Sequence, residues 1–88
     1  MHIREFQQRI EEMYSTTDRA RGAARTFLWL AEEFGELASA IAGDDQKNKE
    51  EEFADVFAWL CSIANVEGVD LEAAVQAKYI DRRPEGHK

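Results

Sequence analysis

Apolar residues recur at spacings of three and four along most of the chain, and this spacing constrains the fold more than any other feature. Side chains three or four positions apart share one face of an α-helix, whereas a half-buried strand requires alternation with a period of two. No such alternation occurs, and the only proline, Pro84, lies near the C-terminus. The sequence therefore predicts an all-α fold.

The apolar stripes predict four helices, at about residues 3–14, 23–42, 49–66 and 71–79. Turn-forming residues fill 15–22, which is predicted to connect the first two helices. Gly43 and Gly68 lie where glycines commonly end helices. Asp70 is predicted to cap the last helix, because an aspartate oxygen accepts hydrogen bonds from the free N–H groups of a first turn.

The length of 88 residues leaves room for a single domain, which we expect at 1–83, with a short tail at 84–88. A domain of this size buries only about 60% of the surface that its unfolded chain exposes, so association with further copies is a natural way to enlarge the core. The single cysteine, Cys61, excludes an internal disulfide, and its apolar neighbours indicate a buried thiol.

The net charge of −7 arises from 18 acidic and 11 basic residues. Such a field does not attract nucleic acid polymers or anionic membranes, and an anionic ligand would need metal ions to reverse the local charge. The chain contains no run of 18 apolar residues and no N-terminal signal pattern. We therefore expect a cytoplasmic protein.

One acidic pattern occurs twice, in residues 32–37 (EEFGEL) and 51–56 (EEFADV). Each residue turns a helix by about 100°, so acids three positions apart share a face. Glu33 therefore pairs with Glu36, and Glu52 with Asp55, at the margin of the apolar stripe in both helices. The glutamate that precedes each pair turns away from it.

Antiparallel packing of the two helices, which their short connection favours, would bring these four acids together. They would repel one another strongly unless a cation lay between them. Mg²⁺ prefers oxygen ligands, keeps several waters and binds substrate phosphates, so the pattern indicates Mg²⁺-assisted phosphate chemistry. The simpler alternative is a set of solvated surface charges. A di-iron site built from E-x-x-H pairs is excluded, because His2 and His87 are both terminal.

The two acidic segments together resemble the signature of the MazG nucleotide pyrophosphohydrolases, with E-E-x-x-E at 32–36 followed by E-x-x-D at 52–55. Further features of the family type are the segments 18–22 (DRARG), 59–60 (WL) and 69–71 (VDL), and Lys78. The resemblance extends over roughly residues 5–83.

This resemblance implies an all-α enzyme that hydrolyses nucleoside triphosphates to the monophosphate and pyrophosphate. It implies that Glu33, Glu36, Glu52 and Asp55 coordinate Mg²⁺, for which Mn²⁺ can substitute, and that the metal activates the attacking water. Glu32 would orient or deprotonate this water, so that Glu32, Glu33 and Glu36 form the catalytic set. Short members of the family assemble as homodimers or homotetramers, with active sites lined by more than one subunit.

Four basic residues are candidates for binding phosphate. Lys78 and Arg82 lie one helical turn apart and could neutralise phosphate oxygens, or they could serve only as favourable charges at a helix C-terminus. The family often has asparagine where Arg82 stands, which places the phosphate contacts in question more than the metal site. Arg21 and Arg25 are weaker candidates.

Two tryptophans, Trp29 and Trp59, are expected beside the metal acids and could stack on a nucleobase, although aromatic residues at helical spacing more often belong to a core. Nothing in the sequence selects a base or sugar. An alternative function is that of a non-catalytic, acidic helical interaction protein, and hydrolysis of another phosphorylated metabolite is a third possibility.

Overall fold

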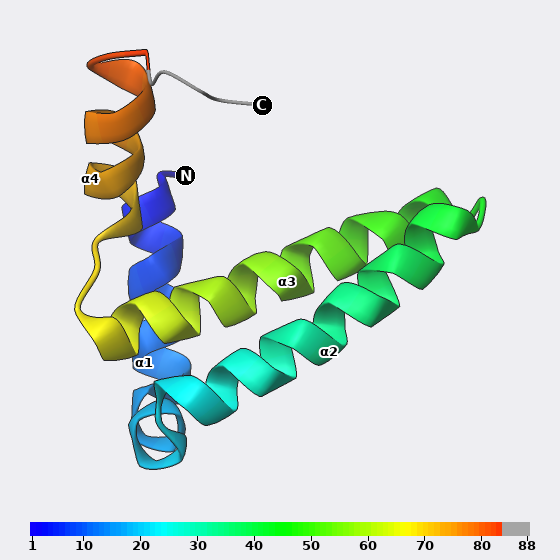
Figure 1. The fold of residues 1–88 in the computed structure, drawn as a ribbon, viewed down its shortest axis with the longest axis horizontal. Coiled ribbons are helices and arrows are strands. Elements are labelled where there is room, and N and C mark those ends of the chain that lie inside the picture. Colours follow the sequence, from blue (N-terminus) through cyan, green and yellow to red (C-terminus); the bar gives the residue numbers. More distant parts are fainter. Residues whose placement is uncertain (84–88) are drawn as a thin grey trace.

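The computed structural model describes residues 1–83 as a set of helices without a strand in that range, which confirms the all-α prediction (Figure 1). The helices are α1 (Ile3–Arg21), α2 (Ala23–Ala42), α3 (Gln46–Glu67) and α4 (Leu71–Val75), which continues into the π-helical turn η1 (Gln76–Ile80). The predicted tail, 84–88, lies outside the described residues. None of the helices in the described part is long and apolar enough to cross a membrane.

The arrangement is built on a long antiparallel hairpin formed by α2 and α3 (Figure 1). α1 crosses this hairpin near its open end, where α2 begins and α3 ends, and packs against α3. α4 extends from the end of α3 along the N-terminal part of α1, and η1 continues in the same direction, away from the hairpin.

The predicted connection at 15–22 is wrong, because α1 continues through these residues to Arg21. Their side chains prefer turns and caps by local chemistry alone, but Asp18 is buried, with 3% of its surface exposed. Tertiary packing thus overrides the local preference. Only Gly22 separates α1 from α2, and its φ of 85° makes the sharp turn that a side-chain-bearing residue rarely adopts.

The other helix ends follow from their capping residues. α3 begins three residues earlier than predicted, because the Asp45 side chain accepts a hydrogen bond from the Asn48 N–H at 3.1 Å. Gly68 ends α3 in the left-handed conformation, as expected. Asp70 caps α4 by accepting from the Ala73 N–H at 3.1 Å, which confirms that prediction. Gly43 is the C-cap of α2, with extended backbone.

Most of the buried core lies where α1 crosses the α2–α3 hairpin, whereas Ala40 lies near the closed end of the hairpin. The apolar members of the core are Ile10, Leu30, Ala40, Cys61 and Ala64. Burial raises the pKa of the Cys61 thiol to about 11, as expected for an inert core cysteine. The rest of the α2 stripe is uncovered: Phe27, Phe34 and Ile41 are 55%, 49% and 55% exposed, because α1 and α3 pack on only one side of α2.

Candidate metal centre

Three carboxylates converge midway along the α2–α3 hairpin. Glu33 and Glu36 of α2 and Glu52 of α3 each offer an oxygen, and these oxygens all lie within 4.8 Å of one another. The antiparallel pairing of the helices produces this meeting. The buried Leu30 lies one turn before Glu33, so the stem of Glu33 is fixed at the margin of the core.

Two of these carboxylates are only partly accessible and lack partners on their inner side. The Oε2 atoms of Glu33 and Glu52 are buried without a hydrogen-bond partner among residues 1–83. Burial of a charged oxygen without a partner is unfavourable. A positive group placed between these oxygens would therefore relieve a cost that the chain itself leaves uncompensated.

Electrostatic repulsion among these carboxylates also favours a positive group between them. The pKa of Glu33 is raised, first by desolvation and then by the charges of Glu36, Asp55 and Glu52. The pKa of Glu52 is raised, again first by desolvation and then by Glu36, Asp55 and Glu51. Asp55 is not one of the three converging ligands, but its charge acts on two of them. An all-oxygen donor set with buried, unpartnered atoms fits a hard divalent cation such as Mg²⁺.

A cleft of about 440 Å³ adjoins the acids on the α1 side. Asp55 forms part of its wall and so connects it to the carboxylate cluster. The remaining lining residues are Ile10, Tyr14, Thr17, Asp18 and Arg21 from α1 and Ala58, Trp59 and Ser62 from α3. A ligand held in this cleft would lie beside the candidate metal centre.

The two predicted tryptophans stack on each other, with Trp59 in the wall of this cleft and Trp29 in that of a second hollow. The rings of Trp29 and Trp59 stack with centroids 6.2 Å apart and an interplanar angle of 12°. The guanidinium carbon of Arg21 lies 5.2 Å from the centroid of Trp59 on which it stacks. Three sequence candidates from different helices therefore form one aromatic and cationic cluster.

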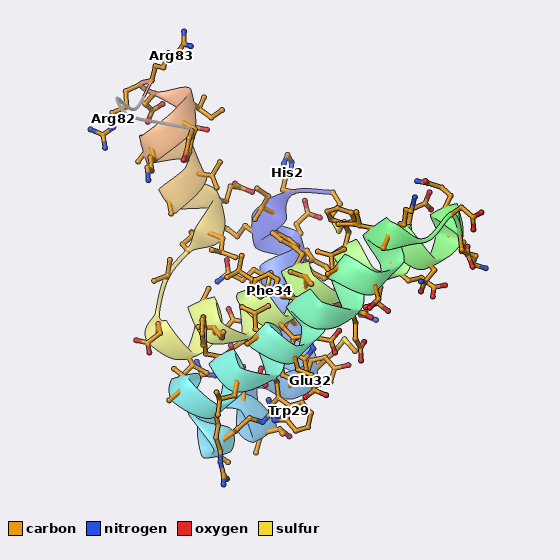
Figure 2. The ribbon with its side chains drawn as sticks, turned by 45° about the vertical axis from the view of Figure 1, so that its right-hand side comes forward. His2, Trp29, Glu32, Phe34, Arg82 and Arg83 are labelled. Carbon is orange, nitrogen blue, oxygen red and sulfur yellow. The ribbon has the colours of Figure 1, made fainter. Side chains whose placement is uncertain are left out.

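Glu32 lies outside the carboxylate trio, as its position on the helix predicted. It is exposed and lines a second hollow, of about 450 Å³, together with Arg21, Arg25, Leu28 and Trp29. Figure 2 shows Trp29 and Glu32 close together on this side of α2. The structure thus gathers Glu32, Arg21 at the end of α1 and Arg25 of α2 around one depression.

The C-terminal cations lie elsewhere within a single chain. Lys78 is in η1, with its Nζ 5.4 Å from the ring centroid of Tyr79. Arg82 is exposed, and Figure 2 shows it at the outer end of the C-terminal segment, away from the labelled Trp29 and Glu32. Their role as phosphate ligands stays a prediction.

The sequence indicated Tyr14 as one more aromatic residue that could stack on a base, and the structure places it in the cleft wall, but the sequence predicted no site role for Asp18. The segment that contains Asp18 was assigned to a connection, so its position on a buried helical face was not considered. The available signal was the spacing of Ile10, Tyr14 and Asp18 at intervals of four, which places these residues on one face of a longer helix.

Comparison with known proteins agrees with this geometry. A family model described as the MazG nucleotide pyrophosphohydrolase domain matches residues 21–87. The chain belongs to this family. The match contains both acidic segments, whereas nearly all of α1 precedes it. A search of the curated proteins gave no match.

Proposed function

We propose that this MazG-family chain is a Mg²⁺-dependent nucleoside triphosphate pyrophosphohydrolase, which converts (d)NTP and water to (d)NMP and pyrophosphate. The observation that carries the proposal is the convergence of Glu33, Glu36 and Glu52, with unpartnered inner oxygens on two of them. Clearance of non-standard or surplus nucleotides in the cytoplasm is a role that fits this reaction.

Glu33, Glu36 and Glu52 would hold the metal, with Asp55 as a fourth oxygen donor one helical turn from Glu52. A bound Mg²⁺ would supply charge neutralisation for the triphosphate and a lowered pKa for a coordinated water. Mn²⁺, which prefers the same oxygen ligands, can substitute for it.

Glu32, the exposed neighbour of Glu33 in the chain, would orient the attacking water and accept its proton. The oxygen of that water forms a bond to the α-phosphorus, and the bond from the α-phosphorus to the bridging oxygen breaks. The electron pair leaves with pyrophosphate. Arg21 and Arg25, which share a depression with Glu32, would balance the charge of the phosphates.

A homodimer or homotetramer would complete the site. The exposed faces of Phe27, Phe34 and Ile41 offer an apolar surface that a second copy can cover. In such an assembly the C-terminal segment of one copy could bring Lys78 and Arg82 to the acids of another. This would reconcile their predicted phosphate role with their position within one chain.

The test is an incubation of the purified protein with a panel of ribo- and deoxynucleoside triphosphates, in Mg²⁺ and in EDTA, with products separated by anion-exchange chromatography. We expect monophosphate and pyrophosphate in Mg²⁺, and their loss in EDTA and in Glu36→Gln. Glu12→Gln, which removes an exposed acid of α1, is the matched control. Diphosphate with orthophosphate would refute the assigned bond cleavage. A folded protein without turnover of any nucleotide would favour a non-catalytic interaction protein.

A further inference from the structure

Asp18 is the most deeply buried carboxylate of the cleft beside the acids. Its residue is 3% exposed, and its Oδ2 atom has no hydrogen-bond partner within residues 1–83. Its Oδ1 atom accepts from Arg21 at 3.4 Å, a long contact at the outer limit of a hydrogen bond. The inner wall of the cleft therefore contains a strong, buried acceptor that residues 1–83 leave unsatisfied.

The position of Asp18 makes this arrangement unfavourable for the isolated fold. Burial of a carboxylate with incomplete hydrogen bonding opposes folding. Asp18 also lies in the last turn of α1, where the carbonyl ends of the helix disfavour a negative charge. A serine or asparagine would fill the same space at less cost. A buried charged acceptor whose ion pair with Arg21 is as long as 3.4 Å points to a ligand that donates hydrogen bonds.

The surroundings of Asp18 include aromatic surface that suits a ligand with a flat face. Trp59 lines the same cleft and stacks on Trp29, while Arg21 covers the Trp59 ring. Asp55, at the cleft wall, connects this region to the metal acids. A molecule with a flat, apolar face, an N–H edge and a phosphate chain would meet complementary groups in each part of the cleft.

We propose that Asp18 is a specificity-determining residue that reads the N–H edge of the substrate base and favours guanine nucleotides. The proposal rests on the pyrophosphohydrolase function and names its preferred substrate. A carboxylate accepts hydrogen bonds but cannot donate them when ionised. Guanine presents two adjacent donors, N1–H and the 2-amino group. Adenine and cytosine place a ring acceptor beside their amino group, and uracil and thymine flank their N–H with two carbonyl oxygens.

The direct test compares GTP with ITP, which differ only in the 2-amino group. In the wild-type protein we expect kcat/KM for GTP to exceed that for ITP by about 10-fold or more, as for loss of a hydrogen bond to a charged group. Asp18→Asn, which replaces one acceptor oxygen by a donor amide, should bring the ratio close to one, because the loss for GTP exceeds the loss for ITP, which has no 2-amino group. Asp44→Asn, at an exposed position in the α2–α3 connection, should keep the wild-type ratio.

A binding measurement separates this proposal from the proposed reaction. GMP and IMP are titrated in EDTA while the fluorescence of the two tryptophans is followed, so that neither metal nor turnover is needed. Tighter binding of GMP, lost in Asp18→Asn, supports the proposal even if no triphosphate is hydrolysed. Equal binding of GMP and IMP by the wild-type protein overturns it, whether or not the enzyme is active. If circular dichroism shows that Asp18→Asn does not fold, the comparison of GMP with IMP binding by the wild-type protein still tests the proposal.

Discussion

Near the C-terminal end of α3, the side chains of Gln7 and Asn65 form a polar cluster that is satisfied within the chain. Gln7 Nε2 donates to Asn65 Oδ1 at 3.0 Å and to the Val69 carbonyl at 2.6 Å, and Gln7 Oε1 accepts from the Leu71 N–H at 2.9 Å. Asn65 Nδ2 donates back to the Gln7 carbonyl at 3.2 Å. One glutamine thus joins α1, α3 and the start of α4.

Nearer the N-terminal end of the same helix, Glu52 meets Glu33 and Glu36 with the opposite result. Inner oxygens of Glu52 and Glu33 have no partner in the described chain, and the charges repel. Both clusters are partly buried and both join separate helices. The amide cluster is satisfied by hydrogen bonds within the fold. The acidic cluster has buried oxygens without partners in the described residues, and a bound ligand would supply those partners. The accounting of hydrogen bonds, and not burial alone, separates a structural site from a functional one.

The largest expected effect comes from the double variant Glu33→Gln/Glu52→Gln. Turnover should fall by at least about 100-fold, because even changes outside the direct ligands of a metal reduce affinity or activity 10- to 100-fold. The melting temperature in EDTA should stay the same or rise, since repulsion between buried acids is removed. Steady-state kinetics and thermal melts measure the two effects. Glu50→Gln, at an exposed position of α3, should change neither. Retained turnover with lowered stability would assign the acids to the fold.

A second prediction concerns Mg²⁺ and stability. Mg²⁺ at about 100 times its Kd should raise the free energy of unfolding by about 2.7 kcal/mol, because it binds only the folded arrangement of the acids. Urea unfolding with and without Mg²⁺ measures this difference. The increment should be absent in Glu33→Gln/Glu52→Gln. An equal increment in the double variant would place the stabilising metal elsewhere on the chain.

A third prediction is that substitution in the amide cluster lowers stability without changing the response to Mg²⁺. Gln7→Ala leaves Asn65, the Val69 carbonyl and the Leu71 N–H without their partner, and should lower the free energy of unfolding by about 2 kcal/mol. The stabilisation by Mg²⁺ should be unchanged. Gln8→Ala, at the exposed neighbouring position, should alter stability by less than about 0.5 kcal/mol. If Gln7→Ala abolished the effect of Mg²⁺ in a folded protein, the two clusters would be coupled and the distinction between them would not hold.

The fold class and the faces on which the acids lie could be predicted from sequence because both depend on local periodicity. Acids three positions apart share a helix face wherever the helix lies, and an apolar stripe beside them locates the margin of the core. The pairing of Glu33 with Glu36 needed no tertiary information. Their meeting with Glu52 needed only the antiparallel hairpin, which a short connection favours.

What the sequence did not reveal depends on packing between distant segments. Residues 15–18 have turn-forming side chains, and only the contact of α1 with α3 shows that they continue a helix and bury Asp18. Asp55 lies outside the trio whose oxygens come within 4.8 Å of one another, and residue spacing alone cannot give such distances. Lys78 and Arg82 lie on a segment that extends away from the acids, so their role depends on surfaces beyond one chain.

The smallest expected effect is the contribution of Asp70 to the pH dependence of stability. Unlike the acids of the candidate metal centre, Asp70 has hydrogen-bond partners within the fold. The hydrogen bond from the Ala73 N–H, followed by that from Arg4, lowers the pKa of Asp70 below its ordinary 3.8. The folded state thus favours the ionised form. Its contribution to stability is complete above the unfolded pKa and is lost as the pH falls through the folded pKa.

Asp70→Asn keeps an oxygen that can cap α4 but removes the charge. The wild-type protein should therefore lose slightly more stability than Asp70→Asn as the pH falls from 5 to about 3, with a small difference because the Arg4–Asp70 pair is exposed and screened by salt. Urea unfolding over this pH range measures the slopes, with Asp44→Asn as the control for removal of an unpaired exposed acid. Equal slopes for the wild type and Asp70→Asn would mean that Asp70 acts through its capping oxygen alone. The charge of Asp70 would then add nothing to the stability of the fold. Among the carboxylates compared here, only those of the candidate metal centre would have an ionisation that affects stability.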